Sequence, residues 1–248
     1  GRLSSRNPNF QNMPRGTTFP VRKAIVSRFH HGYILEGDYR QLEFRVAGFL
    51  SKDKQLYRDV ENNVDVHQYT ADTMGVTRQE AKAHTFKPLY GGVLGTPKEM
   101  RYYEAFKHKY WQVTNWHDKL QKGAVDTKKI KLPSGREYAF PYARYTQYGN
   151  VTNSTAIKNY PVQGFATADL LPLALVNLYA IMKKRNMKSV ICNTVHDSII
   201  LDVHPEERVQ CIDVLRMSML SIKDECNSRY NVNYDMPVDI ELKMGKNW

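Results

Sequence analysis

The sequence predicts an α+β fold, in which strands near both ends of the chain form one antiparallel sheet and a helical region lies between them. The 248 residues suit one large domain or two small ones, and 42% apolar against 25% charged residues is typical of a globular chain. Apolar residues recur at helical spacing through much of the chain. Strand-like apolar runs occur near 33–35, 190–203 and 238–242.

The N-terminal fifty residues contain the first predicted strand. Pro8, Pro14 and Pro20 predict an extended entry, and a short buried strand follows over 33–38. From Gln41 onward apolar residues return every three or four positions, which predicts a helix. The remaining elements are expected in this order: helices over 52–130, a hairpin over 131–146 around Pro133-Ser134-Gly135, a helix over 152–185, two strands over 190–203 interrupted at His196-Asp197-Ser198, a helix over 205–229 and a strand over 238–242.

The chain is strongly basic, with 36 Lys and Arg against 25 Asp and Glu, a formal charge of +11 and a pI near 9.4. Such a surplus favours a polyanionic partner, nucleic acid before membrane, because each phosphate contact releases counterions. A basic surface that binds nothing is the alternative. The three cysteines form no CxxC pair, which argues against zinc and for a reducing compartment.

No segment predicts membrane attachment or secretion. The most apolar stretch, 166–182, contains Asp169 and Pro172 and predicts a buried core helix instead of a membrane span. The first residues lack the apolar run of a signal peptide and begin abruptly, as if cut from a longer chain.

Two acidic residues, Asp38 and Asp197, stand at predicted strand ends. If the first strand lies beside the 190–203 hairpin, both carboxylates emerge at the same edge of the sheet. A fixed carboxylate pair can hold two Mg²⁺ ions for in-line nucleotidyl transfer. The alternative is that both are ordinary turn acids.

A second group of residues predicts nucleotide binding. Arg78, Lys82, Phe86 and Tyr90 follow one another at intervals of four. On a continuous helix they would share one stripe about 18 Å long, with cations for phosphates and rings for sugar and base. An amphipathic helix with a mixed face is the alternative.

With these residues in view, the chain resembles the polymerase region of family A DNA polymerases, the DNA polymerase I type, from Gly1 to Trp248. The resemblance rests on six segments in the family's order and on a similar C-terminal tail, Gly245-Lys246-Asn247-Trp248. The segments are Gly1–Asn12 (primer–template motif), Asp38–Arg45 (motif A), Asp65–His67, Arg78–Gly91 (motif B), Asn159–Gly164 and Val195–Ser198 (motif C).

The resemblance implies a palm, an antiparallel sheet with helices, and a helical fingers insertion. Residues 1–50 would form the first part of the palm, 51–130 the fingers with an O helix at about 77–91, and 131–248 the second part of the palm.

The resemblance also implies a role for each matching residue. Asp38, Asp197 and the Tyr39 carbonyl would bind two Mg²⁺ ions, for which Mn²⁺ can substitute. Lys82 would be catalytic beside the two aspartates. The expected nucleotide contacts are Arg78, Lys82, Phe86, Tyr90, His67, Gln41 and Glu43, with Glu43 as the steric gate against a ribose 2′-OH. The expected DNA contacts are Arg2, Asn9, Gln11, Asn12, Arg136, Asn159, Gln163 and His196.

Three departures from the family pattern stand out. Ser198 replaces a frequent Glu, and Thr155 stands where many members have Arg. Lys87-Pro88 replaces the usual Gly and aliphatic residue, and Pro88 cannot donate to the His84 carbonyl, so a kink or a weakened helical bond is expected there.

The expected function is therefore template-directed DNA synthesis from dNTPs on a primer 3′-OH, by a DNA-directed DNA polymerase. The partners would be primer–template DNA and an upstream thumb or exonuclease region of a longer chain, without a membrane. The Ser in motif C suggests a phage or bacterial source and the cytoplasm of a bacterial or phage-infected cell. A single-subunit RNA polymerase and a non-catalytic DNA-binding remnant are the alternatives.

Some other residues are expected to be structural. Tyr102, Tyr103, Tyr110 and Trp111 could stack on single-stranded template, but their spacing favours a helix core. His117 and His204 are expected to be ordinary surface histidines.

Overall fold

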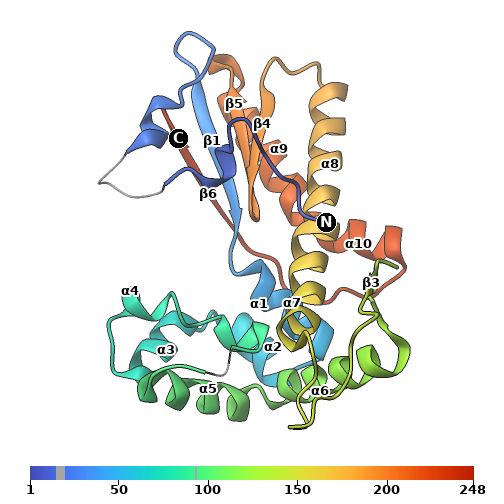
Figure 1. Cartoon of the computed structure of the whole chain (residues 1–248). Coiled ribbons are helices and arrows are strands. Elements are labelled where there is room, and N and C mark those ends of the chain that lie inside the picture. Colours follow the sequence, from blue (N-terminus) through green and yellow to red (C-terminus); the bar gives the residue numbers. More distant parts are fainter. Residues whose placement is uncertain (15–19, 93) are drawn as a thin grey trace. The chain divides into compact units, whose positions relative to one another are not determined.

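The computed structural model describes residues 1–14, 20–92 and 94–248 (Figure 1). The chain folds into two compact units. Unit 1 comprises residues 1–42, 166–233 and 238–248, and unit 2 comprises 43–165 and 234–237. Packing units need not coincide with functional subdomains, so the palm and fingers boundaries at residues 50 and 130 stay predictions.

Unit 1 contains a four-stranded antiparallel sheet with the strand order β4-β5-β1-β6. Its strands are β1 (Tyr33–Tyr39), β4 (Val190–Val195), β5 (Ser198–Val203) and β6 (Ile240–Gly245). The sheet therefore joins the two ends of the chain, and helices supply most of the rest. This architecture confirms the predicted α+β class and the predicted strands.

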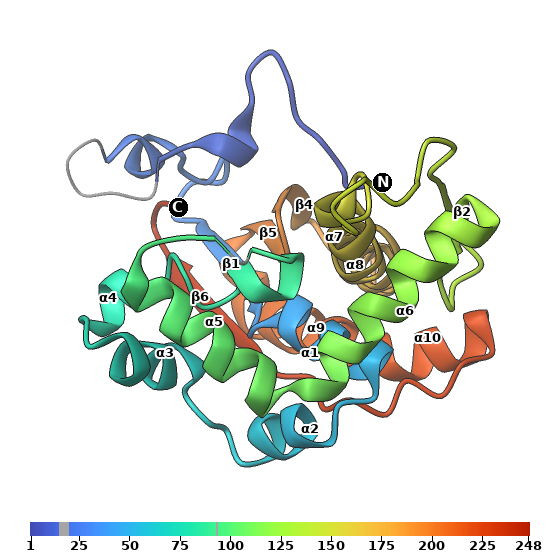
Figure 2. The same cartoon turned by 60° about the horizontal axis from the view of Figure 1, so that its bottom comes forward.

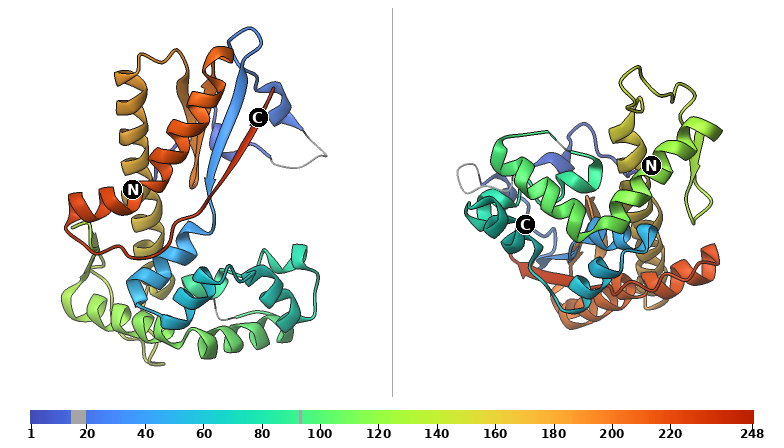
Figure 3. Two further views of the ribbon diagram at one scale, coloured as in Figure 1. Left: turned by 180° about the vertical axis from the view of Figure 1, so that it is seen from behind. Right: turned by 90° about the horizontal axis from the view of Figure 1, so that it is seen from below.

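Helices of unit 1 cover one face of this sheet. Gly37 faces helix α9 (Arg208–Leu220), where an added Cβ would lie 2.5 Å from the Met219 sulfur, and the Tyr39 hydroxyl donates to the Met219 carbonyl at 2.8 Å. Figure 3 shows α9 across this face with α8 (Leu171–Lys184) beside it, and α10 (Ile222–Tyr230) follows α9. Since strand residues alternate, Asp38 lies on the opposite face.

The predicted helix over 152–185 consists of α7 (Ser154–Gly164), a π-helical segment (Phe165–Leu170) and α8. Within the described residues, the stretch Ser154–Lys184 is long and apolar enough to cross a membrane, but 61% of its most apolar window is buried inside the structure. This burial fits the predicted core helix.

Unit 2 is mainly helical, and Figure 2 shows α3, α4 and α5 side by side. Besides α7, it contains α1 (which begins in unit 1 at Leu42 and ends at Ser51), α2 (Lys54–Glu61), α3 (Val66–Met74), α4 (Arg78–Ala81), α5 (Pro97–Lys109), α6 (Trp111–Thr127) and the hairpin β2 (Lys129–Lys131) and β3 (Glu137–Ala139). Local caps start several helices: Asp65 accepts from two α3 amides, and Thr77 and Thr96 form capping boxes with Glu80 and Glu99.

Aromatic residues on α5 and directly after it pack inside unit 2. Tyr102, Tyr103 and Tyr110 are at most 1% exposed. The Tyr110 hydroxyl donates to Asp59 at 2.6 Å, and the Tyr110 ring meets Phe106 edge to face. The prediction that these tyrosines belong to the helix core is confirmed, whereas Trp111 is 56% exposed.

The segment 77–91 is not the continuous helix that the sequence predicts. Helix α4 ends at Ala81, turns follow, and a 3₁₀ turn (η3, Lys87–Tyr90) ends the segment. Pro88 has no N–H, so the His84 carbonyl accepts from Lys87 three residues on, at 3.1 Å. Since 3₁₀ turns advance by three residues, spacing by four does not give Arg78, Lys82, Phe86 and Tyr90 one common stripe.

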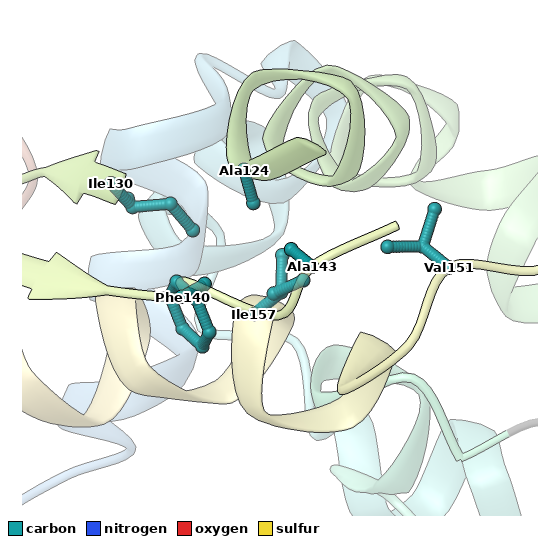
Figure 4. Packing of buried hydrophobic residues seen from close by; sticks show 6 residues of the cluster. All are labelled: Ala124, Ile130, Phe140, Ala143, Val151 and Ile157. Atoms are coloured by element: carbon teal, nitrogen blue, oxygen red, sulfur yellow. The ribbon is translucent and has the colours of Figure 1, made fainter. Parts of the chain in front are cut away.

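A small apolar cluster joins the hairpin region of unit 2 to two helices (Figure 4). Ala124 and Ile157 come from α6 and α7, and Ile130, Phe140, Ala143 and Val151 come from β2 and the chain between β3 and α7. The cluster therefore anchors residues 140–151, which otherwise have little regular structure.

Candidate functional site

The two predicted metal-binding aspartates lie on neighbouring strands of unit 1. Asp38 on β1 is directly opposite Ser198 on β5, and Asp197 immediately precedes that residue. The Tyr39 amide donates to the Asp197 carbonyl at 3.4 Å. The predicted juxtaposition of Asp38 and Asp197 at one end of the sheet is therefore present.

The turn that carries Asp197 has an unusual backbone. His196 connects β4 to β5 with φ of 57°, a left-handed conformation that glycine adopts more readily. Ser198 ties the turn together, since its hydroxyl donates to the Val195 carbonyl at 3.0 Å. The place of His196 at the primer terminus stays a prediction.

The donor set of this end of the sheet fits a hard cation. In residues 1–14, 20–92 and 94–248, no group of three or more His, Cys, Asp or Glu side chains is arranged to hold a metal ion. Asp38, Asp197 and the Tyr39 carbonyl nevertheless offer oxygen ligands, which Mg²⁺ prefers. Mg²⁺ commonly keeps several waters and binds through one or two carboxylates together with substrate phosphates.

The N-terminal segment is attached to the same unit. The Arg2 guanidinium donates to the Thr167 hydroxyl at 3.1 Å, and the Gln11 amide donates to the Thr194 carbonyl of β4 at 2.9 Å. Asn9 caps the short 3₁₀ turn η1 (Phe10–Asn12). The structure thus places Gln11 against the strand that leads into His196.

A group of predicted nucleotide contacts comes together in unit 2. The His67 Nδ1 lies 3.0 Å from the Thr85 hydroxyl, and the His67 ring meets Phe86 edge to face at 5.3 Å. Arg78 forms a 2.7 Å ion pair with Asp65. Burial lowers the pKa of His67, and the nearby Arg78 lowers it further. A neutral His67 beside exposed Arg78 and Lys82 suits hydrogen bonding to phosphate while the two cations supply charge.

The predicted steric gate is also held within unit 2. The Tyr90 hydroxyl donates to the Glu43 carboxylate. This bond ties the end of η3 to the first turn of α1 and orients the carboxylate. Gln41, at a left-handed turn with φ of 54°, belongs to unit 1 instead.

The predicted DNA contacts of unit 2 lie on or near α7. Asn159 and Gln163 are partly buried on this helix, and the Asn159 Oδ1 is buried without a hydrogen-bond partner. A buried polar atom of this kind can accept from a ligand. Arg136 lies at the start of β3 and is also partly buried.

His117 is not the surface residue that the sequence predicts. It is 6% exposed on α6 and bonds to the backbone of Leu89 in η3, while its Nε2 is buried without a partner. Burial lowers its pKa to about 3. It lines a 260 Å³ cavity with Lys158, whose pKa burial also lowers. Its position between Val113 and Leu120 on the helix gave no clear sign of burial, because Trp116 and Asp118 flank it. His204 is partly buried as well, since 19% of its side chain is exposed and its ring meets Phe29 edge to face.

Comparison with known proteins identifies the family. The family model for DNA polymerase family A matches residues 1–248. The chain belongs to DNA polymerase family A. This result confirms the resemblance drawn from the motifs.

Several family A relatives are similar over the whole chain. DNA polymerase I of Caldicellulosiruptor bescii is 30% identical, and thermostable DNA polymerase I of Thermus filiformis is 31% identical, each over 100% of this chain. The chain spans 30% and 31% of the length of these two relatives. The POL domain of Pol1 from M. smegmatis, solved with DNA primer-template and dNTP, has a TM-score of 0.83 at 23% identity, over 100% of this chain and 46% of that chain. This likeness supports the α+β fold.

Proposed function

We propose that this family A chain carries out template-directed DNA synthesis, joining dNTPs to a primer 3′-OH with release of pyrophosphate. The observation that carries the proposal is the pairing of Asp38 with Ser198, which brings Asp38 and Asp197 to one end of the sheet. A solved structural neighbour, the M. smegmatis Pol1 domain, holds primer–template and dNTP.

Asp38, Asp197 and the Tyr39 carbonyl would hold two Mg²⁺ ions, which activate the primer hydroxyl and balance charge on the pyrophosphate when they are bound. Arg78 and Lys82 would neutralise the triphosphate, and Lys82 would protonate the leaving pyrophosphate. Both side chains are exposed, and Arg78 would exchange its ion pair with Asp65 for the phosphate.

Phe86 and Tyr90 would contact the sugar and base of the incoming nucleotide. The Tyr90 hydroxyl holds the Glu43 carboxylate, which supports Glu43 as the group that excludes a ribose 2′-OH. Arg2, Asn9, Gln11, Asn12, Arg136, Asn159, Gln163 and His196 would contact primer or template.

One primer-extension assay with Mg²⁺ tests the function. The wild-type chain should add dNTPs with a clear preference over rNTPs. A preference for rNTPs would favour a single-subunit RNA polymerase, and DNA binding without any extension would favour a non-catalytic remnant. Asp213→Ala, which removes an exposed acid on α9, is the matched control for substitutions of Asp38 or Asp197.

A further inference from the structure

We propose that residues 141–153, here named the tyrosine loop, bind unpaired template DNA by stacking its bases on exposed tyrosine rings. The inference rests on the proposed polymerase function and adds a binding surface to it. The loop lies wholly in unit 2, between β3 and α7.

Three tyrosines of the loop are unusually exposed. Tyr142 and Tyr148 are each 81% exposed and Tyr145 is 54% exposed, whereas the tyrosines of α5 are buried. A large ring that stays exposed does not contribute the free energy that its burial would add to folding. Several such rings in one loop therefore point to a ligand with flat apolar surfaces. Nucleobases are such ligands, and every base has a face on which a tyrosine can stack.

The loop has a defined backbone. The Thr152 hydroxyl donates to the Tyr142 carbonyl at 2.9 Å and accepts from the Arg144 amide at 3.1 Å. Tyr145 forms a β-bridge with Val151, and Gly149, with φ of 77°, donates to the Thr146 carbonyl at 3.0 Å. The rings are therefore held on a fixed frame, which lowers the entropy lost when a ligand binds.

Some side chains of the tyrosine loop are buried and hold it in place, and their neighbours are exposed. Ala143 and Val151 point into the apolar cluster between α6 and α7 (Figure 4). Tyr142 and Arg144, which flank Ala143, are exposed. The buried residues thus fix the loop, and their neighbours are left to meet a partner.

The charge of this region suits a polyanion. No Asp or Glu occurs from residue 138 to residue 168, and the exposed Arg144 lies in the loop itself. Lys128, Tyr142, Arg144 and Asn153 line a hollow of about 620 Å³ beside the loop. Lys128 donates to the Ala143 carbonyl at 2.6 Å, which places its ammonium group at this hollow.

Single-stranded DNA fits these features better than a duplex does. Bases in a duplex are already stacked on one another, so exposed rings gain nothing from them, whereas an unpaired strand offers both base faces and phosphates. The loop also runs directly into α7, which carries Asn159 and Gln163, two of the predicted contacts to primer or template. The unpaired template ahead of the primer is the single strand that the proposed reaction requires.

Fluorescence anisotropy with two labelled DNAs tests the proposal. One is a primer–template with a single-stranded 5′ template overhang, and the other is the same duplex with a blunt end. The double variant Tyr142→Ala with Tyr148→Ala should weaken overhang binding about tenfold or more and leave blunt-duplex binding unchanged, from the stacking contribution of each ring. The variant with Phe at both positions should bind as wild type does, because it keeps the rings.

The control is Tyr179→Ala, which removes a tyrosine 60% exposed on α8 of unit 1 and should change neither affinity. Unchanged overhang affinity in the double alanine variant would overturn the proposal. Equal losses on both DNAs would also overturn it. DNA binding is measured without nucleotides, so it does not depend on catalysis. If wild type fails in primer extension but the double alanine variant still loses affinity only for the overhang DNA, the proposed function is contradicted and DNA binding by the tyrosine loop is supported.

Discussion

In the register between β1 and β5, Asp38 lies directly opposite Ser198, the residue after Asp197. Opposed residues of an antiparallel pair project to the same face, with Cβ atoms about 5 Å apart. Ser198 is fully buried and donates its hydroxyl to the Val195 carbonyl, so it supports the turn beside Asp38. On its other side, Asp38 is directly opposite Glu241 of β6. Asp38 therefore lies between the neutral Ser198 and a third carboxylate on the same face of the sheet.

Replacing either aspartate should abolish nucleotide addition. In Asp38→Ala or Asp197→Ala, a metal ligand is lost whose charge water cannot supply, and extension should fall to below about a hundredth of wild type. Steady-state primer extension with Mg²⁺ measures the loss, and thermal unfolding checks that the fold is kept. Asp213→Ala should extend normally; activity near wild type in both aspartate variants would remove the basis for the two-metal proposal.

Glu43 should control the choice of sugar. Glu43→Ala opens space at the 2′ position and should raise the ratio of rNTP to dNTP incorporation by about tenfold or more. The reason is that discrimination against one small group on a substrate is worth roughly 1–3 kcal/mol of transition-state free energy. Tyr90→Phe removes the hydroxyl that holds the Glu43 carboxylate, so it should change the ratio in the same direction to a smaller extent. Competition assays with rNTP and dNTP give both ratios, and unchanged values would contradict the placement of Glu43.

Phe86 should contact the sugar of the incoming nucleotide. Phe86→Tyr places a hydroxyl on the ring, and the family resemblance implies that this hydroxyl can replace the 3′-OH contact that a dideoxynucleotide lacks. The incorporation of ddNTP should therefore rise relative to dNTP. Single-turnover incorporation of the two nucleotides measures this ratio. Phe106→Tyr is an unsuitable control because that ring is buried, whereas Tyr179→Phe alters an exposed ring of unit 1 and should leave the ratio unchanged.

Buried His117 should make stability depend on pH. Its pKa is about 3 in the folded chain, below the 6.5 of an unperturbed histidine, so the unfolded chain takes up a proton first as the pH falls. The contribution of the neutral, buried His117 to the free energy of unfolding is complete above pH 6.5 and is lost as the pH falls toward 3. Over this range the free energy of unfolding should fall by at most about 1.4 kcal/mol per pH unit because of His117.

Urea unfolding between pH 4 and 7 measures this slope. The His117→Gln variant should show a shallower decrease in the free energy of unfolding as the pH falls than wild type does. The His108→Gln variant, which alters an exposed histidine of α5, should keep the wild-type slope. Identical slopes in all three proteins would show that the protonation of His117 is not linked to unfolding.

The sequence predicts the local features well, because they depend on residues close together in the chain. The strand that contains Asp38, the hairpin interrupted at His196-Asp197 and the core helix over 166–182, which begins with a π-helical segment, all occur where composition and periodicity place them. The family motifs likewise identify candidate site residues without any structure. The helix over 77–91 is the exception, because Pro88 and the turns before it replace α-helical bonds with shorter ones.

Tertiary structure decides which residues distant in the sequence meet and which side chains are buried. The register of β1 on β5 sets Asp38 beside Ser198, and a shift of one residue would turn Asp38 to the other face. Packing of α6 against Leu89 buries His117, while the fixed loop over 141–153 leaves three tyrosines exposed. The same residue types are buried on α5. Burial depends on what packs against a side chain, and sequence periodicity records only which positions along one element share a face.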